Sequence, residues 1–163
     1  MSSFTVTTLS VMRHSGNKKG KKLTYANQVD VALTATLNGN NISIDGPTGP
    51  FPELGVDTGA WHFHFTLDDN TGKNVEFTTL DSADGCAQCP ASAGNNSKLI
   101  TGVRVEAPDP VKGEPPKAHF VDNNNNKAKD GVVNVGFQWN FKCSDSTLTV
   151  GTYDPVVPNG GKS

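Results

Sequence analysis

Hydrophobic and polar residues alternate with a period of two along much of the chain. The clearest example is the segment GVVNVGFQWNF, whose inward face holds Val133, Val135, Phe137, Trp139 and Phe141. Asn, Gly and Gln residues occupy the positions between them. Because successive side chains of a strand point to opposite sides, this pattern predicts a strand with one buried face and one solvated face.

The same alternation recurs in other segments, and it decides the predicted fold class. In QVDVALTATL the inward residues are Val29, Val31, Leu33, Ala35 and Leu37. Further strands are expected in residues 4–12, 40–44, 61–67, 73–80, 98–106 and 147–153. No segment shows a sustained helical repeat, so about eight or nine strands with one-sided burial predict an all-β fold. We expect an antiparallel, immunoglobulin-like β-sandwich, with a closed barrel as the alternative.

Chain length and composition agree with this fold class. The 163 residues predict a single domain over 1–163, and we expect the last few residues to be disordered. Hydrophobic residues make up only 34%, whereas 17 Gly and 10 Pro supply many turns. Such a composition is typical of short strands joined by abundant turns.

Several predicted connections are long for a compact domain. Loops beyond roughly 12–15 residues are usually functional or disordered. If every connection reverses the chain direction, most long connections reach the same end of the fold, and only 107–117 lies at the other. That common end would hold residues 13–23, 45–60, 81–97, 122–131 and the C-terminal tail. The sequence therefore predicts a composite binding rim on a rigid scaffold.

The segment WHFHF contains two histidines that alternate with aromatic residues. In an extended strand Trp61, Phe63 and Phe65 share one face, which we expect to be core. His62 and His64 then share the opposite face, about 7 Å apart along the strand. The favoured interpretation is an amphipathic strand whose histidines face solvent and bind no metal.

A metal site is the competing hypothesis for these histidines. Two imidazoles on one strand face can chelate one ion if a third ligand joins them. His119, His14 and several carboxylates are candidates for that third ligand, although no spacing singles any of them out.

The cysteines form a second candidate constellation. Cys86 and Cys89 have the CxxC spacing but lie in a Gly/Ser/Ala-rich segment followed by Pro90, with no helical pattern behind them. A disulfide, two free thiols, a metal site that recruits Cys143 and a histidine, and a redox pair are all open. Cys143 follows Phe141 on the inward register, which predicts a small buried residue.

Charge and hydropathy narrow the range of partners. Residues 12–22 hold five of the 14 basic residues and no acid, although the net charge of the chain is −2. No aromatic residues interleave these lysines, so we interpret the run as a solvated turn rather than a nucleic-acid site. The chain shows neither a signal pattern nor an apolar run of membrane-spanning length. We expect a cytoplasmic protein that binds neither nucleic acid nor membrane.

Motifs of common enzyme classes are missing from the sequence. There is no GxSxG elbow, no phosphate-binding P-loop and no dinucleotide fingerprint. We therefore nominate no catalytic residue and no cofactor.

One resemblance comes from proline-containing dipeptides in the C-terminal third. The segment PDPVKGEPP contains Asp109-Pro110 and Glu114-Pro115, and YDPVVPNGG follows near the end. In these dipeptides the chain resembles the DP-EP family, a small group of bacterial proteins. The resemblance implies a bacterial origin but no assigned activity and no catalytic residue.

Two functional hypotheses follow from the sequence. The favoured one is a non-enzymatic module that binds a protein or glycan partner through its long loops. The alternative is a small metal-binding protein or metal-dependent enzyme that uses His62 and His64. A third possibility is a homo-oligomer whose loops form the subunit interface.

Overall fold

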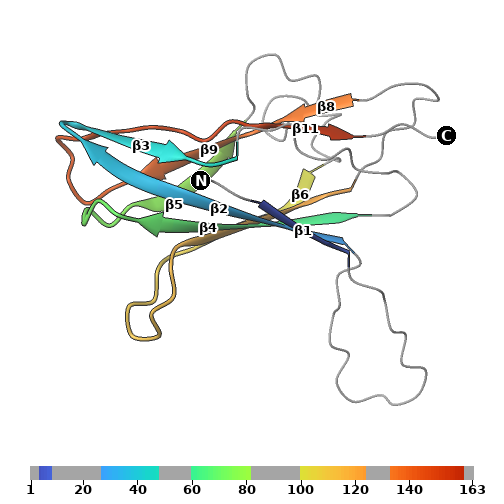
Figure 1. Cartoon of the computed structure of the whole chain (residues 1–163), viewed down its shortest axis with the longest axis horizontal. Coiled ribbons are helices and arrows are strands. Elements are labelled where there is room, and N and C mark those ends of the chain that lie inside the picture. Colours follow the sequence, from blue (N-terminus) through green and yellow to red (C-terminus); the bar gives the residue numbers. More distant parts are fainter. Residues whose placement is uncertain (1–3, 9–26, 48–59, 82–99, 124–132, 160–163) are drawn as a thin grey trace.

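The fold of the chain is all-β. The computed structural model describes residues 4–8, 27–47, 60–81, 100–123 and 133–159 (Figure 1). Within these residues no helix occurs, and hence none long and apolar enough to cross a membrane. The strands are β1 (Phe4–Thr8), β2 (Asn27–Asn38), β3 (Asn41–Asp45), β4 (Trp61–Asp69), β5 (Glu76–Asp81), β6 (Ile100–Glu106), β7 (Lys117–Asp122), β8 (Val133–Gly136), β9 (Gln138–Lys142), β10 (Thr149–Val150) and β11 (Val156–Asn159).

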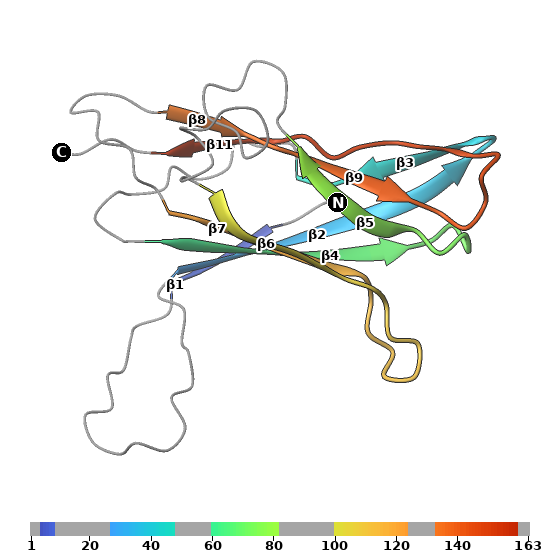
Figure 2. The same cartoon turned by 180° about the vertical axis from the view of Figure 1, so that it is seen from behind.

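Most strands belong to one large sheet. Its order is β10-β3-β2-β4-β7-β6, and β1 adds a seventh strand by pairing with the N-terminal part of β2. The pairs β5–β9 and β8–β11 lie over one face of this sheet (Figure 2). An isolated bridge links Trp139 of β9 to Tyr153, which lies shortly before β11, so the two pairs are neighbours in one covering layer.

The large sheet is mixed, so the expectation of a wholly antiparallel fold is wrong. β2 and β4 run parallel from the pair Gln28–His62 to the pair Ala35–Asp69, and β10 runs parallel to β3. Consecutive strands from β1 to β4 nevertheless reverse direction, as the prediction of a common rim assumed. The parallel pair arises because β4 does not pair with β3 but lies along the opposite edge of β2.

The core lies between the large sheet and the covering layer. Phe65 of β4 contacts Phe120 of the neighbouring β7 and, edge-on, Phe137 and Trp139 of the opposite layer. The centroids of the Phe65 and Trp139 rings are 5.6 Å apart at an interplanar angle of 68°. Such edge-to-face pairs are favourable beyond the area that they bury.

The predicted inward faces are largely confirmed. On β2 and β4 the expected residues are buried, namely Val29, Val31, Leu33, Ala35, Trp61, Phe63 and Phe65. Leu37 and Phe141 are partly buried against the core, whereas Phe137 and Trp139 have no exposed surface. The side chains of Val133 and Val135 lie outside the described part of the chain.

Most of the long connections of the predicted rim also lie outside the described residues, so the rim stays a prediction. The strand ends that lead to them are nevertheless adjacent. Thr8 pairs with Asn27 at one end of the large sheet, and Asp122 pairs with both Trp61 and Ile100 at the same end. These positions agree with the strand directions on which the predicted rim was based.

The connection between β6 and β7 is a hairpin that projects from the large sheet on the side opposite the covering layer (Figure 1). Asp109 and Glu114 exchange backbone hydrogen bonds of 3.0 and 2.9 Å across it. The Asp109 carboxylate also accepts hydrogen bonds from the backbone of Val111 and Lys112, which fixes the turn. The acidic residues of the two DP and EP dipeptides are thus paired with each other.

Replacing Trp139 tests the assignment of the core. We expect Trp139→Ala to lower the free energy of unfolding by roughly 3–5 kcal/mol, the usual cost of emptying a large aromatic site. The matched control is Lys142→Ala on the same strand, whose exposed ion pair with Glu76 contributes little. Urea denaturation measures both, and a loss below about 1 kcal/mol for Trp139→Ala would show that β9 is misoriented.

Candidate functional site

Three histidines gather on the face of the large sheet that points away from the core. His62 and His64 alternate along β4 with the buried Trp61, Phe63 and Phe65, as the sequence predicted. The third histidine is contributed by β7, because His64 and His119 are direct cross-strand neighbours. Strand pairing, rather than sequence spacing, therefore brings His119 to this face.

A chain of hydrogen bonds links two of the histidines to the backbone. His119 Nδ1 lies 3.2 Å from the carbonyl oxygen of Gly102, which can only accept, so Nδ1 carries the proton. In a neutral ring His119 Nε2 is then an acceptor, and His62 Nδ1 at 3.3 Å donates to it. The ring of His64 packs against His119 with a centroid distance of 4.7 Å.

This environment keeps the three histidines neutral. His119 is only 5% exposed, and His62 and His64 are half-buried. Burial, together with the nearby His119, His64 and Arg104, lowers the pKa of His62 to about 4. Burial also lowers the pKa of both His64 and His119. At neutral pH these rings are hydrogen-bonding groups rather than cations.

Charged residues extend the histidine cluster into a row across four strands. Asp30 of β2 pairs with His64, which pairs with His119, which in turn pairs with Arg104 of β6. A second row, two residues away along each strand and on the same face, aligns Thr66, Lys117 and Glu106. Together these rows border a hollow of about 260 Å³, referred to below as the polar pocket. Its lining residues are Asp30, His64, Phe65, Thr66, Arg104, Glu106, Lys117, Ala118 and His119.

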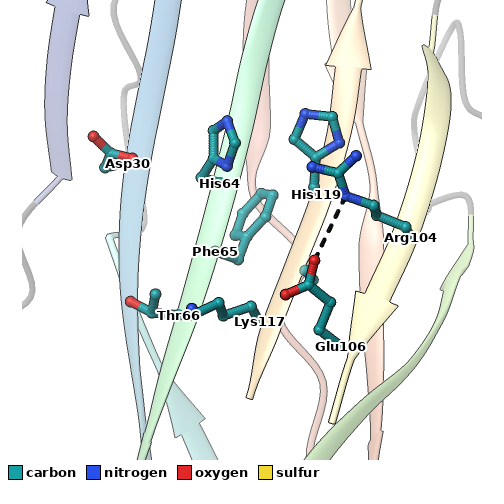
Figure 3. A pocket seen from close by; sticks show the side chains of 9 residues that line it. Asp30, His64, Phe65, Thr66, Arg104, Glu106, Lys117 and His119 are labelled. Atoms are coloured by element: carbon teal, nitrogen blue, oxygen red, sulfur yellow. Dashed lines mark ion pairs between the residues drawn. The ribbon is translucent and has the colours of Figure 1, made fainter. Parts of the chain in front are cut away.

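The polar pocket combines both signs of charge. Figure 3 shows Arg104 near His119, with its ion pair to Glu106 dashed, and Lys117 extending toward Thr66. Arg104 Nε and Glu106 Oε1 are 3.8 Å apart, and both side chains are more than half exposed. Ion pairs as exposed as this one contribute little to stability, so either side chain can turn to a ligand.

The predictions for His62 and His64 can be compared with their positions in the structure. The face of His62 and His64 is confirmed, and both side chains are only partly exposed there, because His119 and Arg104 pack beside them. Within the part of the chain that the structure describes, no group of three His, Cys, Asp or Glu side chains is arranged to hold a metal ion.

The predictions for the remaining candidates are only partly covered by the described residues. His14, Cys86 and Cys89 lie outside them. Cys143 is half-buried rather than buried, and its thiol donates to the carbonyl of Asp145 at 3.1 Å. Its side chain still packs against the core, as its inward register predicted.

The charged residues of the polar pocket were not identified from the sequence. Arg104 and Glu106 alternate with Val103 and Val105, so their face of β6 could have been predicted. Nothing in the alternation shows that β6 pairs with β7, or that β2 lies beside β4. Without those pairings Asp30 and Arg104 cannot be placed near the histidines.

No protein-family model matches the chain, and no curated protein matches it. The resemblance to the DP-EP proteins and the bacterial origin that it implies therefore stay predictions.

The depressed histidine pKa values predict a pH-dependent stability. The pKa of His62 is about 4 in the folded chain against 6.5 in the unfolded chain. Between these values only the unfolded chain binds the proton, so stability must fall as the pH is lowered through this window. We expect the free energy of unfolding, measured in urea, to decrease between pH 7 and about pH 4.5, and His62→Gln to reduce that slope.

Asp69→Asn is the control for this measurement. Hydrogen bonds from Thr71 and Val75 lower the pKa of Asp69 below its ordinary value of 3.8 despite its partial burial, so its titration lies below the histidine window. The variant should shift the absolute stability and leave the slope above pH 4.5 unchanged. An unaltered slope in His62→Gln would contradict the neutral-histidine assignment.

Proposed function

We propose that the chain is a non-enzymatic binding module whose polar pocket holds a neutral, polyhydroxylated ligand such as a terminal sugar of a glycan. An immunoglobulin-like β-sandwich in the cytoplasm is the proposed scaffold. The observation that carries the proposal is the balanced composition of the pocket. Two acidic, two basic and two neutral imidazole side chains surround one hollow on regular strands.

The charge balance favours a neutral ligand over an ion. An anion placed between Arg104 and Lys117 would also lie near Asp30 and Glu106, and a cation would meet the opposite conflict. A hydroxyl group both donates and accepts hydrogen bonds, so it can satisfy carboxylates and cationic groups together. Several hydroxyls on one small ring match this alternation of donors and acceptors.

The pocket size fits a small ligand or the end of a longer one. Its volume of about 260 Å³ is slightly below the usual range of roughly 300–1,000 Å³ for ligand sites. The lining side chains project from paired strands, which keep their backbone positions fixed before a ligand arrives. Such preorganisation reduces the entropy lost on binding.

The protonation state of the histidines supports binding rather than acid–base catalysis. General acids and bases work best when their pKa lies near the operating pH. Burial holds the pKa of His64 and His119 below 6.5, and that of His62 near 4. Their hydrogen bonds and ring packing suit a role in shaping the pocket.

Membership of the DP-EP group is part of the proposal. It is supported by the pairing of Asp109-Pro110 with Glu114-Pro115 in the β6–β7 hairpin, where the two acids exchange backbone hydrogen bonds. The two dipeptides thus close the hairpin together, a structural role that unpaired dipeptides elsewhere in the chain would lack.

Metal binding is the second candidate function, and one distance favours it. His62 Nδ1 and His119 Nε2 are 3.3 Å apart. Two nitrogens bound to one tetrahedral zinc at about 2.0–2.1 Å would also lie about 3.3 Å apart. Elemental analysis separates the two candidates. Near-stoichiometric zinc, iron or nickel that is lost in the His62→Gln/His119→Gln double variant would replace the glycan proposal.

A saccharide titration tests the glycan proposal. A panel of neutral mono- and oligosaccharides is added to the protein, and NMR shifts of the histidine rings and β4 amides are followed. We expect saturable shifts for at least one sugar. Asp30→Asn or Arg104→Ala should weaken its binding at least about tenfold, because each removes a charge-assisted hydrogen bond.

Asp68→Asn is the matched control for this titration. Asp68 is exposed, lies on the same face of β4 as His64 and does not line the pocket, so binding should be unchanged. The proposal fails if no sugar shifts the pocket signals, or if inorganic phosphate binds there more tightly than every sugar.

A further inference from the structure

β6 forms an open edge of the large sheet. One side of the strand pairs with β7, and within the described residues no strand pairs with its other side. Residues 101–106 are all exposed, and two of them are large hydrophobic residues, Val103 at 44% and Val105 at 42%. An unpaired strand edge is a template for pairing with another strand.

The hydrogen bonds of β7 show which of its residues face β6. The carbonyl of Pro116 accepts a hydrogen bond of 3.0 Å from the backbone N–H of Leu67 in β4. Pro116 therefore directs its backbone toward β4. Because backbone groups alternate between the two sides of a strand, Lys117 and His119 direct theirs toward β6.

The open side of β6 follows from this alternation. Glu106 pairs with Lys117 and Arg104 pairs with His119, so these two β6 residues direct their backbone groups to β7. Val103 and Val105 then direct their N–H and C=O groups to the open side. The same two residues carry the exposed apolar side chains.

The sequence of this edge is complementary to itself. We propose that β6 pairs in antiparallel fashion with β6 of a second copy of the chain, around a two-fold axis at Val105. In this register Arg104 faces Glu106 of the partner subunit, and Glu106 faces Arg104 of the partner subunit. Directly opposed side chains in a sheet lie about 4.5–5.5 Å apart at Cβ, close enough for two equivalent ion pairs.

The register also places the apolar residues of the edge together. Val105 lies opposite its own copy, and Val103 lies opposite Ala107 of the partner subunit. Two-fold self-complementarity of this kind is the commonest arrangement in homo-oligomers. A charged strand edge usually deters self-pairing, but here two opposite charges separated by one residue attract their copies.

The length of the paired segment is set by local backbone geometry. Gly102 has a positive φ of 63°, and the pairing register shifts between Thr101 and Arg104. Regular pairing is thus confined to about residues 103–107, which predicts a dimer of modest affinity rather than an obligate one. Because Arg104 and Glu106 also line the polar pocket, the dimer would bring two pockets together and allow bivalent binding.

Sedimentation equilibrium across a concentration series tests the dimer. We expect the wild-type chain to associate to a dimer and no further. Val105→Pro removes the outward N–H, for which no strand among the described residues supplies a partner, and proline is tolerated at a sheet edge. This variant should remain monomeric with an unchanged circular dichroism spectrum. The proposal is overturned if the wild-type chain stays monomeric up to a protein concentration of about 1 mM, because the dissociation constant would then be weaker than the millimolar limit considered for the dimer.

Charge exchange tests the register itself. Arg104→Glu and Glu106→Arg should each raise the dimer dissociation constant at least about tenfold, since like charges then face each other. The double variant Arg104→Glu/Glu106→Arg restores the pairs and should return the constant to within about threefold of the wild type. A double variant no tighter than the single ones would overturn this register.

The control exchanges a charge pair away from the edge. Lys142 and Glu76 form an ion pair of 3.6 Å between β9 and β5. The variant Lys142→Glu/Glu76→Lys should leave dimerisation unchanged. A loss of dimerisation in this control would place the interface elsewhere and overturn the proposal, as would a Val105→Pro variant that still dimerises.

Discussion

The strict alternation of β4 is the constraint on which the rest of the structure depends. Its aromatic residues can all be buried only if every second residue points to the opposite face. Burying one such side chain stabilises the fold by roughly 1.5–3 kcal/mol, so three in succession fix the register of the strand. β4 pairs with β2 on one side and β7 on the other, so paired residues of these two strands have their side chains on the same face as their partners in β4. The apolar face of the three strands packs in the core, and the opposite face carries the polar pocket.

The pocket and the open sheet edge are two consequences of the same strand order. β6 is the edge strand beyond β7. The side chains of Arg104 and Glu106 complete the pocket, and the neighbouring residues Val103 and Val105 direct their backbone groups to the unpaired side of the strand. Ligand binding and self-association would therefore share the same two side chains. The buried histidines lie further inside, where neutral rings fill space and hydrogen-bond without an uncompensated charge.

Period-two alternation was sufficient to predict most of the strands, the inward faces of β2 and β4 and the burial of Trp139, because each depends on local sequence alone, but it did not single out β7 or β11. It could not reveal that β4 crosses to the far side of β2, since a parallel and an antiparallel neighbour bury the same face. His119 shows the same limit for the site. The face on which its side chain lies follows from the alternation of side chains along its own strand. Its position opposite His64 depends on pairing between segments 55 residues apart in the chain. The pocket charges on β2 and β6 required two further pairings of this kind.

The pairing of β4 with β7 is the central claim, and one nuclear Overhauser contact tests it directly. Pro116 directs its backbone toward β4, so His64 and His119 form a non-hydrogen-bonded pair, whose Cα atoms lie about 4.5 Å apart. The structure predicts a strong Hα–Hα contact between His64 and His119. A contact from His64 Hα to Ala118 or Phe120 Hα instead would mean a register shift of one residue. That shift would turn one strand's core face outward and contradict both the core and the pocket.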